Sequence, residues 1–204
     1  MSDSIERRRI CVFCGSAFGA NPEYRRAAEE LGTEIGRRGL GLVYGGASAG
    51  TMGMLADSAL AAGAEVSGVI PRTLVEREIA HRGLSRLYEV ETMHERKALM
   101  ASLADAFIAL PGGYGTLDEF LEILTWAQLR IHSKPCALIN TLGYYDGLLA
   151  FLDNAVREGF LKAENRDLIL VSRTAEEAVS LIGERWASAG ESQTTARTIS
   201  PIMP

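Results

Sequence analysis

The sequence predicts an α/β protein of one domain, built on a doubly wound parallel sheet with helices on both sides. Over about the first 170 residues, short apolar stretches alternate with helical segments of roughly 10–15 residues, as in βαβ units. Three of the apolar stretches run directly into glycine, at Gly15, Gly45 and Gly112. The length of 204 residues suits a single domain. Together these features indicate a Rossmann-like fold, whose ligands bind beyond the carboxyl ends of the strands.

In the first half of the chain, apolar residues and turn signals predict three strands, at 9–14, 39–44 and 65–70. A helix is expected from Asn21 to about Arg38, because Asn is a favoured N-cap and Pro22 suits a first helical turn. A second helix of small residues is expected at 51–62. Residues 71–91 have mixed charge and no clear period, so we expect an irregular loop with at most a short turn of helix.

The second half repeats the alternation of helix and strand. The helix expected at 116–130 is strongly amphipathic, with Phe120, Ile123, Leu124 and Ala127 on one stripe. Polar, aperiodic residues after 188 predict a domain over 1–188 and a disordered tail over 189–204. The other elements expected are helices at 92–103, 144–158 and 175–187 and strands at 106–110, 135–140 and 168–171.

Charge and hydropathy restrict the partners. The formal net charge of -5 argues against a nucleic-acid partner, because such proteins usually carry a basic excess. No apolar run approaches the roughly 20 residues that cross a bilayer, so no membrane association is expected. Arg7 to Arg9 followed by apolar residues imitates a signal peptide, but the apolar run stops at Gly15. We therefore expect a cytoplasmic protein.

Cys11 and Cys14 form a C-x-x-C, and the chain has one further cysteine. No second pair completes a tetrahedral metal site, and a redox motif normally opens a helix whereas this one lies within an expected strand. We expect ordinary strand residues in a reducing compartment, and neither a metal nor another cofactor.

The stretch Pro-Gly-Gly-Tyr-Gly-Thr-Leu-Asp-Glu at 111–119 lies between an expected strand and helix. Glycines let backbone N–H groups approach an anion, and the helix N-terminus adds partial positive charge, so a phosphate is the expected ligand. The stretch is neither G-x-G-x-x-G nor a P-loop. The glycine-rich stretch 45–53 is either a second phosphate loop or only a tight turn.

Two alternatives remain open from spacing alone. Glu119 lies three residues after Thr116, so it is either a carboxylate facing the phosphate site or the last residue of a capping box. Thr92 begins a similar box, which places Arg96 and Lys97 near a helix N-terminus. Cations there oppose the helix dipole unless an anionic ligand is present, although a solvated face would also explain them. His94 is more typical of a surface histidine than of a catalyst.

The motif at 111–119, preceded by Met-His-Glu-Arg-Lys at 93–97, is similar to the paired signature of the LOG ("Lonely Guy") family. The resemblance extends over about 170 residues, through Cys11–Ser16, Tyr44–Gly46, 125–129 and Gly143–Tyr145. It implies a Rossmann-like homodimer that hydrolyses the N-glycosidic bond of adenine-type nucleoside 5′-monophosphates to free base and ribose 5-phosphate, without a cofactor. LOG proteins are cytokinin riboside 5′-monophosphate phosphoribohydrolases, formerly described as lysine decarboxylases.

By motif match, the resemblance implies Arg96 and Glu119 as the catalytic pair. Two positions depart from the family pattern: Ala47 replaces a glycine in the second loop, and Asp118 replaces the usual glutamate. The implied phosphate cradle is Gly113, Tyr114, Gly115 and Thr116, the nucleotide site is lined by Glu78, Lys97 and Thr125, and Ser16, Gly45 and Gly46 are further substrate-binding candidates from the other two strand ends.

Three other functions were weighed. A pyridoxal-dependent decarboxylase is disfavoured, because the chain has only three lysines, Lys97, Lys134 and Lys162. A nucleotide-binding or carrier module without hydrolysis is the serious alternative, since one fold hosts many functions. Arg96 together with Glu119 favours the enzyme. Within the enzyme reading, the sequence does not distinguish AMP from N6-prenylated ribotides as the preferred substrate.

Overall fold

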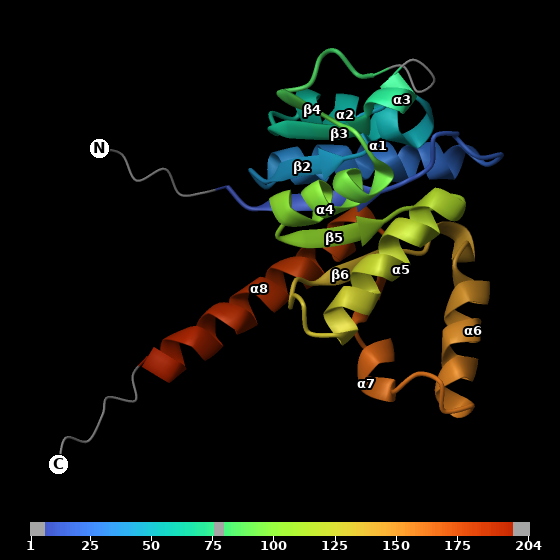
Figure 1. The fold of residues 1–204 in the computed structure, drawn as a ribbon, viewed down its shortest axis with the longest axis vertical. Coiled ribbons are helices and arrows are strands. Elements are labelled where there is room, and N and C mark those ends of the chain that lie inside the picture. The colour runs from blue at the N-terminus through green and yellow to red at the C-terminus, as the bar shows by residue number, and fades with distance from the viewer. Residues whose placement is uncertain (1–6, 76–79, 198–204) are drawn as a thin grey trace.

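The computed structural model describes residues 7–75 and 80–197 and contains a seven-stranded sheet with helices on both faces (Figure 1). The strand order is β4-β3-β2-β1-β5-β6-β7 and all pairs are parallel, which confirms the predicted fold class. The strands are β1 (Arg9–Phe13), β2 (Gly41–Tyr44), β3 (Val66–Pro71), β4 (Arg86–Val90), β5 (Ala106–Ala109), β6 (Cys136–Ile139) and β7 (Ile169–Ser172).

The strand order reverses between β1 and β5. From β1 the chain proceeds outward through β2, β3 and β4, then returns to β5 on the other side of β1. Loops that leave the carboxyl ends of β1 and β5 therefore diverge, and open α/β sheets bind ligands in the crevice formed at such a point.

Helices cover both faces of the sheet (Figure 1). One face packs against α1, α2 and α8, and the other against α4, α5 and α6. Side chains alternate along β1, so Ile10 and Val12 face the first set whereas Cys11 and Phe13 face the second. The helices are α1 (Pro22–Arg37), α2 (Gly50–Ala61), α3 (Arg72–Val75), α4 (Met93–Leu103), α5 (Tyr114–Gln128), α6 (Asp146–Arg157), α7 (Ala163–Arg166) and α8 (Ala175–Arg197), with a 3-10 turn η1 (Thr141–Gly143).

The same alternation separates the two cysteines of the C-x-x-C. Cys11 lies in the cluster beneath α4 and α5, whereas Cys14 lies in the cluster beneath α1 and α2. All three cysteines are buried free thiols. They are packing residues of the strands.

The structure differs from the sequence prediction in several elements, of which two concern long segments. Residues 86–90, predicted as part of a loop, form the edge strand β4, which pairs with β3 over five residues. The residues of this edge strand are exposed or half-buried, and apolar and charged residues do not alternate along it, so the sequence carries no clear strand signal. In addition, α8 continues to Arg197, so helix occupies much of the segment predicted as a tail.

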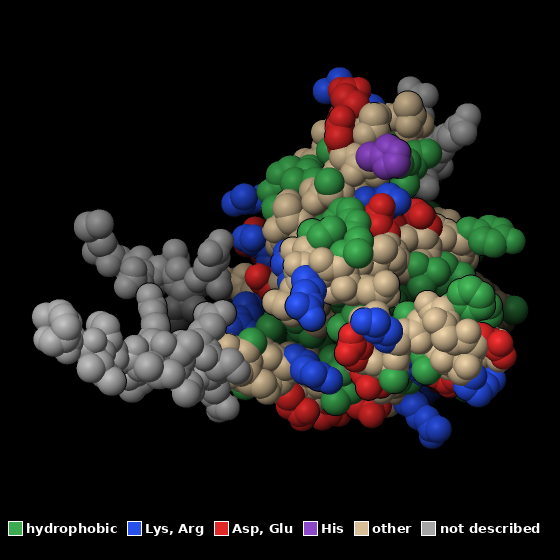
Figure 2. All heavy atoms as spheres, turned by 60° about the horizontal axis from the view of Figure 1, so that its bottom comes forward, with side chains coloured by type: hydrophobic (Ala, Val, Ile, Leu, Met, Phe, Trp, Pro, Cys, Tyr) green, Lys and Arg blue, Asp and Glu red, His purple; other side chains and the backbone are tan. Residues whose placement is uncertain are grey.

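Nowhere in the described ranges is there a helix long and apolar enough to span a membrane. Figure 2 shows acidic and basic side chains interspersed over one face of the molecule.

Candidate active site

The loops after β1 and β5 meet at the point where the strand order reverses. A Cβ atom built on Gly15 would lie 3.7 Å from the Cα of Gly112, so the two loops are in close contact. The N-terminal turn of α2 joins them, because the hydroxyl of Thr51 donates a 2.9 Å hydrogen bond to the carbonyl of Gly15. These loops form the floor of the candidate site.

Arg96, in the first turns of α4, is 6% exposed and reaches across the carboxyl ends of two strands. Its Nε donates to the carbonyl of Val69 at 3.1 Å, and its Nη2 donates to the carbonyl of Gly45 at 3.2 Å. A buried guanidinium with two backbone partners is held in a fixed orientation. The solvated-face explanation for Arg96 is therefore wrong.

Glu119 faces Arg96 from α5. Its Oε1 lies 3.9 Å from Nη1 of Arg96, and both side chains are about nine-tenths buried. Because α5 begins at Tyr114 and not at Thr116, Thr116 lies inside the helix and the pair is not a capping box. Glu119 is a buried carboxylate aimed at a buried cation.

The second predicted capping box, that of Thr92 and Glu95, is formed only in part. Thr92 is the N-cap of α4, and its Oγ1 accepts a 3.1 Å hydrogen bond from the N–H of Glu95. The carboxylate of Glu95 accepts from the N–H of Glu91, at 2.9 Å, instead of that of Thr92. His94 is exposed, as a surface histidine would be.

The Arg96–Glu119 pair affects the pKa of the thiol of Cys11, in the central strand β1. Burial raises the pKa of Cys11 well above its usual value, Glu119 raises it further, and Arg96 lowers it. Cys11 is completely buried and stays protonated at neutral pH. It packs beneath the pair and supplies no nucleophile.

The loop after β2 is shaped around Arg96. A Cβ on Gly45 would overlap Nη2 of Arg96, so only glycine fits there. Gly46 has a φ of +79°, which also favours glycine. Ala47 has no such requirement: its φ is negative, it is buried, and its backbone bridges to Ala80. The alanine at this position is therefore compatible with the loop.

Lys97 joins α4 to α5. Its Nζ lies 3.1 Å from Asp118 and 3.2 Å from Glu122, and its side chain is 12% exposed. Burial lowers its pKa, but hydrogen bonds and charge from Asp118 and Glu122 outweigh burial and raise it. An amine held protonated is a poor nucleophile for a Schiff base. Asp118 points to Lys97, so it is Glu119 that faces Arg96.

The predicted phosphate cradle is open. A Cβ on Gly113 or Gly115 would meet nothing within 4 Å, and Tyr114 is 94% exposed. Gly113 is the N-cap of α5 without a side-chain cap, and the first turn of a helix leaves its N–H groups without intrahelical acceptors. Thr116 is buried against Gly112 beneath this turn. The backbone there is arranged to receive an anion.

Two predicted residues, Thr125 and Ser16, do not join this cluster. Thr125 is exposed, donates to the carbonyl of Leu121, and lies about 9 Å along α5 from Glu119. Ser16 is exposed in the loop after β1, where its backbone lies against Gly50. Glu78 lies outside the described residues.

Tyr144 and Tyr145 donate hydrogen bonds to the backbone that leads into the cradle, and neither was predicted to be functional. Tyr144 Oη donates to the carbonyl of Gly112, and Tyr145 Oη donates to the carbonyl of Leu110, each at 2.7 Å. Their sequence signal was only that Gly143–Tyr145 belongs to the family resemblance. A contact between residues more than thirty positions apart requires the fold to be known.

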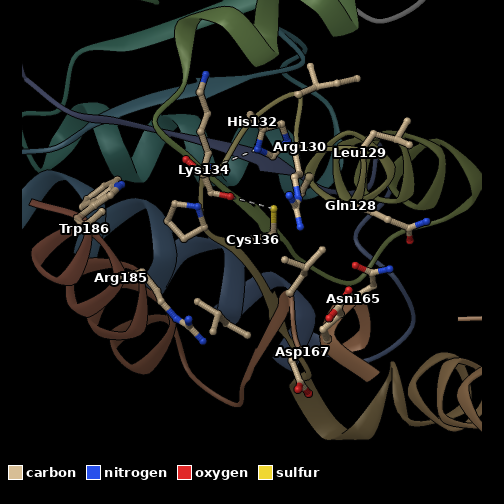
Figure 3. A pocket seen from close by; sticks show the side chains of 18 of the residues that line it. Gln128, Leu129, Arg130, His132, Lys134, Cys136, Asn165, Asp167, Arg185 and Trp186 are labelled. Carbon is tan, nitrogen blue, oxygen red and sulfur yellow. Dashed lines mark hydrogen bonds between the residues drawn. The ribbon is translucent and has the colours of Figure 1, made fainter. Parts of the chain in front are cut away.

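A groove of about 1290 Å³ lies at the other end of the strands, near the amino ends of β1, β5, β6 and β7. Its walls come from the end of α5, the segment 130–135, the region of α7, and α8 (Figure 3). None of the predicted site residues lines it. Among the described residues, no group of three His, Cys, Asp or Glu side chains is arranged to hold a metal ion.

The fold and this cluster define a Rossmann-like α/β protein with an open, glycine-rich helix N-terminus and a buried Arg–Glu pair at its switch point. The family model described as "Possible lysine decarboxylase" matches residues 52–182. The chain belongs to this family, and the relatives described next are LOG phosphoribohydrolases. It is 52% identical over 172 residues to the cytokinin riboside 5′-monophosphate phosphoribohydrolase LOG1 of Arabidopsis thaliana, covering 84% of this chain and 81% of that protein.

A second relative, the phosphoribohydrolase LOG of Oryza sativa subsp. japonica, is 52% identical over 177 residues, 87% of this chain and 73% of that protein. Solved structures with the same fold include the molybdenum cofactor binding protein of Rippkaea orientalis, with TM-score 0.67, 23% identity, and coverage of 89% and 98%. The Moco carrier protein of Chlamydomonas reinhardtii has TM-score 0.68, 21% identity, and coverage of 90% and 99%. These two similarities show the fold alone.

Proposed function

We propose that this protein hydrolyses the N-glycosidic bond of adenine-type nucleoside 5′-monophosphates, including N6-prenylated ones, to free base and ribose 5-phosphate. The observation that carries the proposal is the buried pair of Arg96 and Glu119 beside an open helix N-terminus. The identity of about half to named phosphoribohydrolases supports it.

In the proposed reaction the C1′–N9 bond breaks as water adds to C1′. The sugar passes through an oxocarbenium-like state, which a nearby carboxylate stabilises. Glu119 plays this part and accepts a proton from the attacking water, and it returns that proton to solvent once the water oxygen is bonded to C1′. The departing base takes up a proton from solvent at a ring nitrogen. Arg96 orients Glu119 across a distance of 3.9 Å.

The cradle of Gly113, Tyr114, Gly115 and Thr116 holds the 5′-phosphate at the N-terminus of α5. Binding energy from this remote group then positions the sugar. We assign Lys97 to the nucleotide site from the family resemblance, with its amine held by Asp118 and Glu122. Gly45 and Gly46 keep the loop after β2 open for Arg96. We assign Ser16 and Glu78 to the rim of the nucleotide site, from the family resemblance.

The catalytic pair is tested by replacing Glu119 with Gln and, for comparison, the adjacent Asp118 with Asn. Base released from AMP and from isopentenyladenosine 5′-monophosphate is followed by chromatography. We expect Glu119→Gln to lower kcat by about 100- to 10,000-fold, as loss of an acid–base group does, and Asp118→Asn by less than about tenfold. Equal losses would contradict the assignment. Nucleotide binding without base release by the wild type would favour the carrier module.

We also propose that the protein is a homodimer, formed through an exposed stripe of α5 and the flank of α6. Leu121 and Leu129 are 37% and 62% exposed, and Thr125 lies between them at helical spacing. In α6, no residue is buried and Phe151 is 65% exposed. Exposed apolar side chains that share a helix face are typical of an interface.

This arrangement gives Thr125 a function. Because Thr125 lies away from Glu119 of its own chain, it lines a nucleotide site only if that site belongs to the partner. We expect Thr125→Asp and Glu119→Gln to be inactive alone. A purified heterodimer of the two variants would have one intact site of two and about half of wild-type activity. An inactive heterodimer would contradict this sharing. Thr33→Asp, on α1 with the same backbone hydrogen bond, is the control.

A further inference from the structure

We propose that the hydroxyl groups of Tyr144 and Tyr145 position the glycine-rich loop that receives the substrate's phosphate. The proposal rests on the proposed function and extends it to two residues that do not touch the substrate. Both are positioning residues, which act through the backbone of residues 110–113.

The two hydrogen bonds lie on either side of Pro111. Tyr145 Oη donates to the carbonyl of Leu110 at the end of β5, and Tyr144 Oη donates to the carbonyl of Gly112. The carbonyl of Gly113 is already used, since it accepts from the N–H of Leu117 in the first turn of α5. The carbonyls of Leu110, Gly112 and Gly113 are thus fixed as the chain passes from strand to helix.

Fixing the carbonyls of Gly112 and Gly113 fixes the N–H donors of the residues that follow them. The carbonyl of Leu110 belongs to the peptide bond of Pro111, which has no N–H, so Tyr145 anchors only the end of the strand. In a trans peptide the C=O and N–H point in opposite directions, so the bond from Tyr144 sets the direction of the Gly113 N–H. A hydrogen bond to a carbonyl also strengthens the N–H of the same peptide group as a donor. Gly112, Gly113 and Gly115 have little conformational preference of their own. The hydrogen bonds from the tyrosines therefore restrict a backbone that its glycines leave conformationally free.

The turn after β6 is built to direct both rings. Leu142 and Gly143 have positive φ values of 54° and 72°. Asn140 accepts a 2.7 Å hydrogen bond from the N–H of Tyr145, and its amide donates to Asp146 at 2.7 Å. The ring of Tyr144 packs edge-on against Tyr145, with 5.0 Å between ring centroids.

Burial separates the roles of the two hydroxyls. Tyr145 is 2% exposed, and burial raises its pKa above the usual value, so it remains a donor at any working pH. Its loss would leave a buried carbonyl unpaired and would destabilise the fold. Tyr144 is 45% exposed, so water can replace its hydroxyl and the fold should be preserved. Tyr144→Phe is therefore the informative variant.

The experiment measures kcat and KM for AMP and the dissociation constant for inorganic phosphate, in wild type and Tyr144→Phe. Losing one positioned hydrogen bond should raise both KM and the phosphate dissociation constant about threefold to tenfold, with kcat within about twofold. The control is Tyr24→Phe, whose ring packs against Tyr144 with 5.5 Å between centroids and whose hydroxyl bonds to no described residue. It should behave as wild type.

A merely structural role would lower the melting temperature and leave both phosphate readouts unchanged, which would overturn the proposal. Equal effects of Tyr144→Phe and Tyr24→Phe would also overturn it. The phosphate measurement needs no catalysis, so a wild type that binds phosphate but releases no base would reject the proposed function and leave this inference testable.

Discussion

At the scale of single residues, the site depends on contacts that leave no room for a side chain. Gly45 contributes its carbonyl to Arg96, and a Cβ at this position would overlap the guanidinium. The tolerance of the site for substitution should therefore be lowest where a glycine faces a buried cation, even though the glycine itself performs no chemistry.

Gly45→Ala should displace Arg96 from Glu119 and lower kcat/KM for AMP by at least about tenfold, because a misplaced catalytic group loses much of its effect. The control is Gly183→Ala in the interior of α8, where a Cβ meets nothing within 4 Å. That change should keep activity and stabilise the helix by about 0.5–1 kcal/mol. Melting curves and steady-state rates test both variants, and an active Gly45→Ala would show that Arg96 is not needed in place.

The catalytic pair could be named from the sequence only through the family motifs. Spacing alone left Glu119 between a capping role and a catalytic one. Helix α5 begins two residues before Thr116, so Thr116 is not its N-cap and no capping box forms. The side chain of Glu119 instead faces Arg96. Helix ends are difficult to predict to within two residues, and here the functional interpretation depended on that difference.

At the scale of elements, buried strands and capped helices could be predicted from the sequence, whereas the edge strand β4 could not. Asn21 and Pro22 marked the start of α1 correctly, because its N–H donors need a local partner that sequence reveals. The strand β4 was missed, since an edge strand with a largely exposed pattern has little apolar signal. Its stability comes from pairing with β3, which is a tertiary contact.

The connection of η1 to the cradle shows the same limit. Nothing in the sequence near Tyr144 indicates that its hydroxyl meets Gly112, 32 residues away. Adjacent strands β5 and β6 bring the two turns together at one edge of the sheet. Residues that position others across a sheet edge can be recognised only after the strand order is known.

At the scale of the whole molecule, three buried thiols link stability to pH. Burial raises the pKa of Cys14 and of Cys136 from 9.0 to about 12. Between these values the unfolded chain loses protons that the folded chain retains. The contribution of these thiols to the free energy of unfolding should therefore be constant well below pH 9 and fall as pH rises toward 12, by up to about 1.4 kcal/mol per pH unit for each thiol.

Urea unfolding at about pH 8, 9.5 and 10.5 measures this dependence. Cys11, Tyr44 and Tyr145 have pKa values shifted in the same direction and should steepen the fall. Cys136→Ala should reduce the slope because it removes one of these groups. A free energy of unfolding that stays level up to pH 10.5 would mean that the thiols are reached by water in the folded state.

The central claim is that a phosphate held at the N-terminus of α5 places the glycosidic bond beside Glu119. The most direct measurement compares adenine release by the wild type from AMP and from adenosine, which differ only in the phosphate. We expect kcat/KM for AMP to exceed that for adenosine by at least about 100-fold, because remote binding energy is used to position the sugar. Equal values for the two would contradict it, since the cradle would then take no part in the reaction.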